Sequence, residues 1–288
     1  MTSIWNLANL TCPLCQQSLQ ALEEKNTPSI VRTMCCNNKH SFDIGKPGYL
    51  HLIPVQNKRS KEPGDNKEMV AARKRFLGKG FYQPISKALN LLIEEEMVTS
   101  SNILDLGCGE GYYTTELAAQ ITDQSLIYGL DISKAAVQQA AKRTSNIIWL
   151  VANSSKIPLS DQSVDIIFSV FSPIVPEESL RILKPNGLLI TATAESSHLL
   201  ALRNEIYEDV RDYDNKKLEK QLASHFTLKS AKVIHHPLTL TNSEDVLDLL
   251  HMTPHYWRTT TDKRNQLSLL STLQTTLAVQ LQVFTPNR

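Results

Sequence analysis

A glycine-rich turn flanked by acidic residues is the stretch of the sequence best suited to bind a nucleoside ligand. An apolar run at 103–106 leads into a G-x-G-x-G turn at 107–111, and Asp131 lies twenty residues beyond its last glycine. Glycines accept positive φ and let the backbone approach a ligand closely. Asp131 follows a predicted strand at 126–130, and ligands of α/β sheets bind at the carboxyl ends of strands. Its carboxylate is therefore placed to accept both hydrogen bonds of a ribose diol.

The spacing of the glycines separates two classes of cofactor. Dinucleotide sites use G-x-G-x-x-G to rest a pyrophosphate on a helix N-terminus. Here the turn has the shorter spacing and lies between Asp105 and Glu110, which would repel a diphosphate and attract a cation. The segment 105–111, Asp-Leu-Gly-Cys-Gly-Glu-Gly, resembles motif I of class I S-adenosylmethionine-dependent methyltransferases, whose cofactor carries a sulfonium and an α-ammonium group. A nicotinamide or flavin site is the alternative.

Four of the five cysteines lie in the first 36 residues, with spacing typical of a structural zinc site. Cys12 and Cys15 form a C-x₂-C pair, and Cys36 forms C-x₃-H with His40 after a spacer of twenty residues. Two such knuckles deliver four ligands to a tetrahedral ion. A segment this short cannot build its own core, so we expect the metal to supply its folding energy. Free thiols or a redox pair are the alternative.

The elements that must position these groups alternate between strand and helix, which predicts a Rossmann-like α/β fold. We expect a mostly parallel sheet of seven strands that ends in an antiparallel hairpin at 226–235 and 275–284. The remaining strands are expected near 103–106, 126–130, 147–151, 165–171 and 188–193. Helices are expected near 65–77, 85–97, 133–143, 176–183, 199–211, 215–223, 243–251 and 262–274.

Three polar residues at the ends of predicted elements have roles in this interpretation. Asp65 and Glu68 have the spacing of a capping box, with Asp65 as the N-cap of the first helix. Asn153 follows the third strand, where an Asp or Asn can hydrogen-bond an adenine amino group. An asparagine that caps its own turn is the equally open alternative.

Charge is distributed unevenly along the 288 residues, although the net charge is only +1. Residues 46–87 hold ten Lys or Arg against three acids, which is typical of a polyanion-binding segment; a solvated basic helix is the alternative. The candidate RNA-binding residues are Lys58, Arg59 and Lys61 in a loop, and Arg73, Lys74 and Arg75 on a helix. With no apolar stretch of about 20 residues and no signal-like N-terminus, we expect a cytoplasmic protein that does not interact with membranes.

Motifs along nearly the whole chain resemble one family. They are the cysteine-histidine finger, Lys-Arg-Ser-Lys-Glu-Pro-Gly-Asp at 58–65, Gly-Phe-Tyr-Gln-Pro at 80–84, the glycine turn, Ile-Thr-Ala-Thr at 190–193, and Met-Thr-Pro at 252–254 with Trp257-Arg258. Together they resemble the bacterial 23S ribosomal RNA (guanine-N1)-methyltransferases that modify hairpin 35. The resemblance implies zinc on Cys12, Cys15, Cys36 and His40, and a homodimer with an RNA cleft between finger and core. It also implies cofactor contacts from Tyr82, Gly109, Glu110 and His198.

The predicted function is therefore S-adenosylmethionine-dependent methylation of N1 of a guanine in 23S ribosomal RNA. The predicted cofactor site adds Asp105, Gly107, Asp131 and Asn153 to the residues above, and the predicted domains are 1–45, 46–98 and 99–288. Guanine N1 carries a proton, and the sequence does not identify the base that accepts it. Phe171, Tyr82 and Trp257 are candidates to stack on the splayed base. The alternatives are a methyltransferase for a small molecule or another RNA, a dinucleotide oxidoreductase, and a non-catalytic zinc and RNA-binding module.

Overall fold

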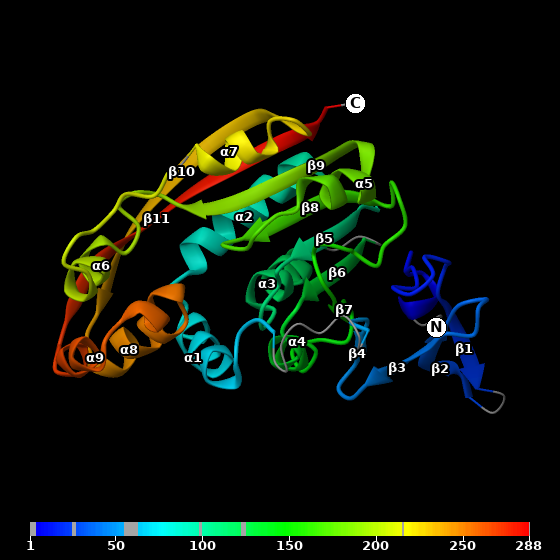
Figure 1. Cartoon of the computed structure of the whole chain (residues 1–288), viewed down its shortest axis with the longest axis horizontal. Coiled ribbons are helices and arrows are strands. Elements are labelled where there is room, and N and C mark those ends of the chain that lie inside the picture. Colours follow the sequence, from blue (N-terminus) through cyan, green and yellow to red (C-terminus); the bar gives the residue numbers. More distant parts are fainter. Residues whose placement is uncertain are drawn as a thin grey trace.

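One continuous β-sheet organises the protein, and both ends of the sequence contribute strands to it (Figure 1). The computed structural model describes residues 4–24, 27–54, 63–97, 100–121, 125–214 and 216–287. The eleven strands in these ranges lie in the order β1-β2-β3-β4-β7-β6-β5-β8-β9-β11-β10. Their bounds are β1 Gln20–Glu24, β2 Thr27–Cys35, β3 Ser41–Gly45, β4 Tyr49–His51, β5 Asn102–Leu106, β6 Leu126–Asp131, β7 Ile148–Val151, β8 Val164–Val170, β9 Leu183–Ala194, β10 Phe226–Leu240 and β11 Leu273–Pro286.

Strands β5 to β11 form the sheet that the sequence predicts. Strands β7, β6, β5, β8 and β9 are parallel, and β11 lies antiparallel between β9 and β10. The terminal hairpin is longer than expected, because β10 and β11 stay paired from Phe226 with Pro286 to Leu240 with Leu273. The carboxyl ends of β5, β6 and β8 therefore meet at one edge of the sheet, where the predicted ligand residues follow.

The remaining four strands come from the cysteine-rich N-terminal segment, which we call the ribbon (residues 10–54). Strands β1 to β4 pair antiparallel in sequence order, and β4 then lies parallel to β7, with Tyr49 opposite Trp149. The sheet thus has eleven strands in the described residues rather than the seven expected. The physical reason is that β7 would otherwise be an open edge with unpaired backbone groups, which β4 satisfies.

Helices cover both faces of the sheet. Their bounds are α1 Lys67–Gly78, α2 Gln83–Glu96, α3 Tyr112–Gln120, α4 Lys134–Ala140, α5 Pro176–Ile182, α6 Leu200–Ile206, α7 Lys217–Leu222, α8 Ser243–His251 and α9 Thr261–Ser268, with short 3₁₀ helices η1 Ile4–Asn6 and η3 Pro254–Arg258. Several are shorter than predicted, α6 and α9 by the most: α6 ends at Ile206 rather than near 211, and α9 ends at Ser268 because β11 already begins at Leu273. Each of these helices is too short or too polar to cross a bilayer.

The first helix is capped one residue later than the capping-box pattern predicts. Asn66, and not Asp65, is the N-cap of α1, and its side chain accepts a hydrogen bond from the Met69 amide at 2.9 Å. An asparagine side chain performs this role as well as an aspartate. The carboxylate of Asp65 is consequently available to pair with Arg73 of the same helix.

The ribbon shares a hydrophobic core with the sheet. Leu10, Met34 and Leu50 are fully buried and belong to the same cluster as Leu104 of β5 and Leu130 of β6. On the other face, helices α1 to α4 and α8 form a second cluster over the same strands. The ribbon therefore packs directly on the sheet, and in Figure 1 it lies at the opposite end of the molecule from α6, α8 and α9.

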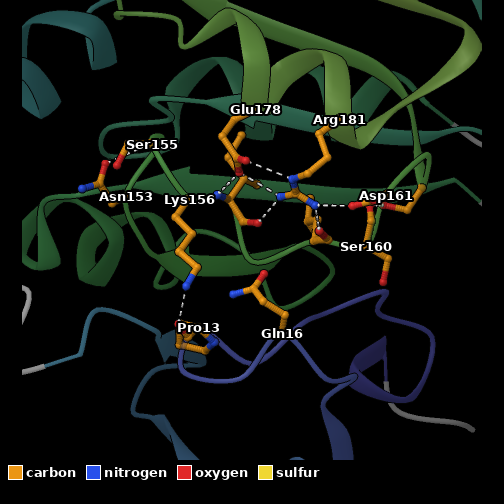
Figure 2. Close-up of polar contacts among 12 residues, drawn as sticks. Pro13, Gln16, Asn153, Ser155, Lys156, Ser160, Asp161, Glu178 and Arg181 are labelled. Atoms are coloured by element: carbon orange, nitrogen blue, oxygen red, sulfur yellow. Dashed lines mark hydrogen bonds and ion pairs between the residues drawn. The ribbon is translucent and has the colours of Figure 1, made fainter.

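The loop after β7 ties the ribbon to the sheet (Figure 2). Lys156 donates a hydrogen bond from Nζ to the carbonyl of Pro13, between the two cysteines of the first knuckle, at 2.9 Å. Leu159 forms an antiparallel bridge with Leu10. Arg181 of α5 supports this loop on the side away from the ribbon. Its guanidinium donates to the carbonyl of Leu159 at 2.9 Å and pairs with Glu178.

Candidate active site and metal centre

A cavity of about 850 Å³ lies at the carboxyl ends of β5, β6 and β8. Its size is within the usual range for a small-molecule cofactor site, about 300–1,000 Å³. In the described part of the chain, the cavity is lined by the glycine turn, the end of β6 and the segment 170–173. Residues from α1, from the stretch before α7 and from the α8–η3 connection also line it. Of the predicted cofactor residues, it brings together Tyr82, Gly107, Gly109, Glu110, Asp131 and His198.

Two positions in the glycine turn admit no side chain. Gly107 has a φ of 87°, and a Cβ there would lie 2.0 Å from Ser172 Oγ. Gly111 has a φ of 83°, and a Cβ there would lie 2.7 Å from the ring of Trp149. The left-handed backbone and the close neighbours both require glycine. Gly107 and Gly109 line the cavity, so the turn presents backbone without side chains there, as a closely held cofactor needs.

Asp131 is held at the end of β6 by two backbone amides. Its Oδ2 accepts from Gly109 at 2.9 Å and its Oδ1 from Ser133 at 2.7 Å. Burial raises the pKa of this carboxyl, while the two amide hydrogen bonds lower it. Each oxygen of a carboxylate has a second lone pair, so both can also accept a ribose hydroxyl.

The two acids that flank the turn differ in their position. Asp105 does not line the cavity: it is buried behind the turn, where Thr114 donates a hydrogen bond to Oδ2 at 2.6 Å. Burial raises its pKa to about 7. Glu110 lines the cavity and is paired through Oε2 with Arg143, whereas its buried Oε1 has no partner among the described residues. Asp105 therefore braces the turn, and its predicted contact with the cofactor needs correction.

Tyr82 and His198 meet in the cavity wall although they are 116 residues apart. The Tyr82 hydroxyl lies 3.5 Å from His198 Nε2, and His198 Nδ1 accepts from the Ala278 amide at 3.2 Å. Burial lowers the pKa of His198 to about 4, so the ring is neutral at pH 7. Because Nδ1 is the acceptor, the proton of the neutral ring lies on Nε2, which is thus a donor on the cavity side.

Phe171 has an unusual conformation beside this pair. It directly follows β8, has a φ of 54°, and its side chain remains 43% exposed in the cavity wall. One side of the ring packs against His198, with the ring centroids 5.4 Å apart. A bulky residue at positive φ is strained, and such strain is concentrated at functional sites. Phe171 is thus suited to stack on a planar ligand.

Asn153 does not line the cavity, which corrects the adenine contact predicted for it. Its side chain is exposed, and Oδ1 accepts a hydrogen bond from the Ser155 amide at 2.9 Å (Figure 2). Asn153 therefore caps its own turn, the alternative that the sequence left open. The physical reason is that the chain turns after β7 toward the ribbon, where Lys156 contacts Pro13.

The four predicted metal ligands converge at one end of the ribbon. The ligand atoms of Cys12, Cys15, Cys36 and His40 all lie within 4.8 Å of one another. Three of the separations are 3.5–3.6 Å: Cys12 Sγ to His40 Nδ1, Cys36 Sγ to the same nitrogen, and Cys15 Sγ to Cys36 Sγ. Tetrahedral zinc with bonds of about 2.0–2.3 Å requires ligand separations close to these values. The donor set therefore fits structural Zn²⁺ with every position filled by protein.

Cys35 is outside this cluster although it is adjacent to one of the ligands. Its Sγ lies 3.3 Å from the Cys36 carbonyl oxygen. The choice of Cys36 over Cys35, made from the spacing to His40, thus agrees with the geometry.

The predicted RNA-binding residues have different environments. Lys74 is exposed on α1, whereas Arg75 pairs with the buried carboxylate of Asp248 on α8. Arg73 lies in the cavity wall, where it pairs with Asp65. Arg73 is thus placed for a ligand of the cavity rather than for an extended polynucleotide. Lys58, Arg59 and Lys61 lie outside the described residues.

Several cavity residues were missed by the sequence interpretation. They are Asp65, Asp212, Asp214 and Lys217, together with the segment 252–255. The Met-Thr-Pro motif at 252–254 was a usable signal, because it formed part of the family resemblance. The acids of 212–214 had no such signal, since exposed aspartates in a connection between helices are common.

Comparison with known families agrees with the two sites. Residues 98–254, more than half of the chain, match the family described as "Methyltransferase domain", and residues 10–61 match the zinc-ribbon family described as "RlmA, N-terminal". Among solved structures, the fold is similar to a provisionally assigned methyltransferase from Bacillus halodurans C-125 (TM-score 0.50, 14% identity, 67% of this chain and 96% of that one). It is also similar to a chain of the Haloferax volcanii complex of the Trm112 activator with its methyltransferase (TM-score 0.51, 18% identity, 78% and 100%). Fold and site thus define a class I S-adenosylmethionine-dependent methyltransferase with an N-terminal zinc ribbon.

Relatives at full length narrow the class further. The 23S rRNA (guanine(748)-N(1))-methyltransferase of Streptomyces fradiae is 30% identical over 284 residues, covering 96% of both chains. Bacillus subtilis (strain 168) YxjB, provisionally named a 23S rRNA (guanine-N(1)-)-methyltransferase, is 28% identical over 94% of this chain and 95% of its own. The chain belongs to the 23S rRNA (guanine-N(1)-)-methyltransferase family. Its cofactors are S-adenosylmethionine and Zn²⁺.

Proposed function

We propose that the protein methylates N1 of a guanine in hairpin 35 of 23S ribosomal RNA. The observation that carries the proposal is the combination of a methyltransferase cavity and a four-ligand ribbon in one chain that is similar over 96% of its length to a guanine-N1 enzyme. A small-molecule methyltransferase does not need the ribbon to bind its substrate. An RNA methyltransferase can use it to recognise the RNA.

We assign different cavity residues to the two reactants, S-adenosylmethionine and the guanine. S-adenosylmethionine, when bound, supplies an already activated methyl group, so the protein mainly has to orient the acceptor and exclude water. We propose that Asp131 binds the ribose of the cofactor and that the backbone of Gly107 and Gly109 contacts the cofactor closely. We assign the guanine ring to the exposed side of Phe171. Tyr82, Glu110 and His198 keep their proposed contacts with the cofactor.

The N1 proton must be removed from the guanine, and we assign its acceptor to the pair Asp212 and Asp214. Five acids line the described cavity wall. Asp65 and Glu110 are paired with arginines, and Asp131 accepts two backbone amides. The remaining two are exposed aspartates before α7, of which Asp214 accepts a hydrogen bond from one backbone amide and Asp212 has no side-chain partner among the described residues. A carboxylate can bind the N1–H and amino groups of guanine together.

We further propose that the ribbon and the basic segment bring RNA to this cavity. The division into 1–45, 46–98 and 99–288 stays a proposal: the start of the methyltransferase match at residue 98 is close to the last boundary, whereas the zinc-ribbon match extends to residue 61, past the first one. Lys74 and the exposed Trp257, which η3 connects to the cavity wall, would contact the polynucleotide. Lys58, Arg59 and Lys61 retain their proposed RNA-binding role.

We infer that the protein works in the cytoplasm, where ribosomal RNA is found, and as a homodimer. Both rest on the family resemblance. Light scattering on a size-exclusion column would test the dimer: a mass near twice the 32.3 kDa of the chain is expected, and a monomer at micromolar concentration would contradict it.

Transfer of a labelled methyl group tests the proposed function. Purified protein and labelled S-adenosylmethionine are incubated with 23S ribosomal RNA from cells that lack the protein. We expect label in N1-methylguanosine after digestion to nucleosides. Label in another nucleoside, or none in RNA although the protein binds S-adenosylhomocysteine, would contradict the proposal.

A further inference from the structure

The proposed function does not yet explain the role of Arg73, a charged residue that lines the cavity. It lies on α1, its side chain is 25% exposed, and it lines the cavity. Its Nη1 lies 3.4 Å from the position that a Cβ on Gly109 would take. A guanidinium thus abuts the middle glycine of the turn that cradles the cofactor.

The cavity otherwise carries mainly negative charge. Asp65, Glu110 and Asp131 line its inner wall, and they suit the sulfonium and ammonium groups of S-adenosylmethionine. The cofactor also carries a carboxylate, which such a wall would repel. Lys217 is the other strongly basic residue in the described wall, but it is exposed on α7. A planar guanidinium binds a carboxylate through two parallel hydrogen bonds, which a lysine cannot do.

Neighbouring elements hold the Arg73 side chain in place. Nη1 donates to Asp65, and Nη2 donates to the Met252 carbonyl at 2.9 Å. Asp65 is itself fixed at the end of β6, since its carbonyl accepts from Ser133 Oγ at 2.7 Å. A guanidinium has five N–H donors, and these contacts within the described residues use two of them. The others remain for a ligand, and the rotamer needs no reordering on binding.

We propose that Arg73 binds the α-carboxylate of S-adenosylmethionine while Asp131 binds its ribose. The two groups lie on either side of Gly109: Arg73 faces its Cα, and Asp131 accepts from its amide. They would therefore hold the cofactor across the turn, Arg73 at the carboxylate of its methionine part and Asp131 at its ribose. Arg73 has this role for any methyl acceptor, so the assignment rests on the proposed methyl transfer and not on guanine as the substrate.

Two ligands that differ only in the carboxylate test the assignment by calorimetry. They are S-adenosylmethionine and its decarboxylated form, which keeps the sulfonium and the amine. We expect the wild type to bind the first about 10- to 100-fold more tightly, as for a hydrogen-bonded charge pair. Arg73→Gln is expected to bind both alike, at the wild-type affinity for the decarboxylated form. Lys232→Gln, at an exposed lysine of β10 outside the proposed sites, is expected to keep the full preference.

Each other outcome overturns the assignment. A wild type that binds the two ligands equally has no carboxylate site, whatever the variants do. If Arg73→Gln keeps the preference, another residue binds the carboxylate. If Arg73→Gln binds both ligands more weakly by the same factor, Arg73 only supports the cavity wall. Arg73→Lys keeps the charge beside Asp65 and guards against misfolding; it is expected to retain only part of the preference. A protein that shows this preference but does not methylate RNA would refute the proposed function alone.

Discussion

Asp131 accepts a hydrogen bond from the backbone N–H of Gly109, with 2.9 Å between Oδ2 and the amide nitrogen. This bond joins the end of β6 to the turn after β5, so the proposed ribose-binding acid and the cofactor-cradling backbone form one unit. Because Asp131 also accepts from Ser133, its carboxylate has a single orientation before any ligand arrives. Such preorganisation reduces the entropic cost of binding.

Asp131→Asn is expected to weaken binding of S-adenosylhomocysteine by about 10- to 100-fold, because hydrogen bonds to a charged acceptor contribute about 1.5–3 kcal/mol. The amide also places an N–H₂ against one of two backbone donors. Calorimetry measures the change, and Asp161→Asn, at a side chain 74% exposed, is the matched control. Equal affinities for the two variants would remove Asp131 from the site.

Zinc is expected to be present at one ion per chain and to hold the ribbon together. Cys15→Ala removes a ligand and is expected to lose the ion and lower the unfolding temperature, because so small a unit depends on its metal. Cys35→Ala is the control, since its Sγ lies outside the cluster. Metal analysis with thermal unfolding tests both; a wild type without zinc, or equal losses in the two variants, would refute the site.

Trp257→Ala is expected to weaken binding of a hairpin 35 transcript by about 5- to 150-fold, the range for a lost base–aromatic stack of about 1–3 kcal/mol. Its side chain is 65% exposed, on the 3₁₀ helix that begins in the cavity wall. Leu91→Ala, at a side chain 58% exposed on α2, is the control. Binding of S-adenosylhomocysteine is expected to be unchanged. Gel-shift titration is the measurement, and a wild-type affinity in Trp257→Ala would exclude the stack.

The double variant Asp212→Asn with Asp214→Asn is expected to lower kcat by about 10²- to 10⁴-fold, the usual contribution of general base catalysis. Its affinity for S-adenosylhomocysteine is expected to stay within twofold of the wild type. Asp209→Asn, an exposed aspartate in the same connection, is the control. Single-turnover methylation measures the rate. A double variant as fast as the wild type would show that another group accepts the proton.

Two histidines of the cavity wall, buried His198 and half-buried His255, are expected to make the protein less stable in weak acid. Burial lowers the pKa of His198 and of His255 to about 4, whereas a histidine in the unfolded chain has a pKa of 6.5. Between these values the unfolded chain binds more protons, so the free energy of unfolding falls as the pH falls from about 6.5 toward 4. Denaturant titrations across this range measure the slope, and His198→Gln is expected to reduce it. An unchanged slope would contradict the neutral state of His198.

The features that could be predicted from the sequence alone are those whose residues lie close together along the chain. The G-x-G-x-G turn with Asp131, and the two cysteine knuckles, each specify a local backbone geometry, and the structure brings their residues together. The fold followed in the same way from alternating strands and helices. The unpredicted parts depend on pairs distant in sequence: β4 beside β7, and Tyr82 against His198.

The errors at the site have one common cause, the direction of a side chain. Asp105 and Asn153 have the expected positions along the chain, but the first points behind the turn to Thr114 and the second bonds to the amide of Ser155. Arg73 was grouped with the RNA-binding residues because charge composition does not distinguish the faces of a helix. Its direction follows from the Asp65 and Met252 contacts, which only the tertiary structure supplies.

Primer extension on 23S ribosomal RNA tests the central claim most directly. A methyl group on N1 blocks the Watson–Crick edge of guanine, so reverse transcriptase stops beside it. RNA from cells that contain the protein is expected to show a stop at a single guanine of hairpin 35, which is absent from cells that lack it and returns with the wild-type gene but not with the Asp131→Asn variant. Identical extension patterns from both kinds of cell would contradict the proposed function.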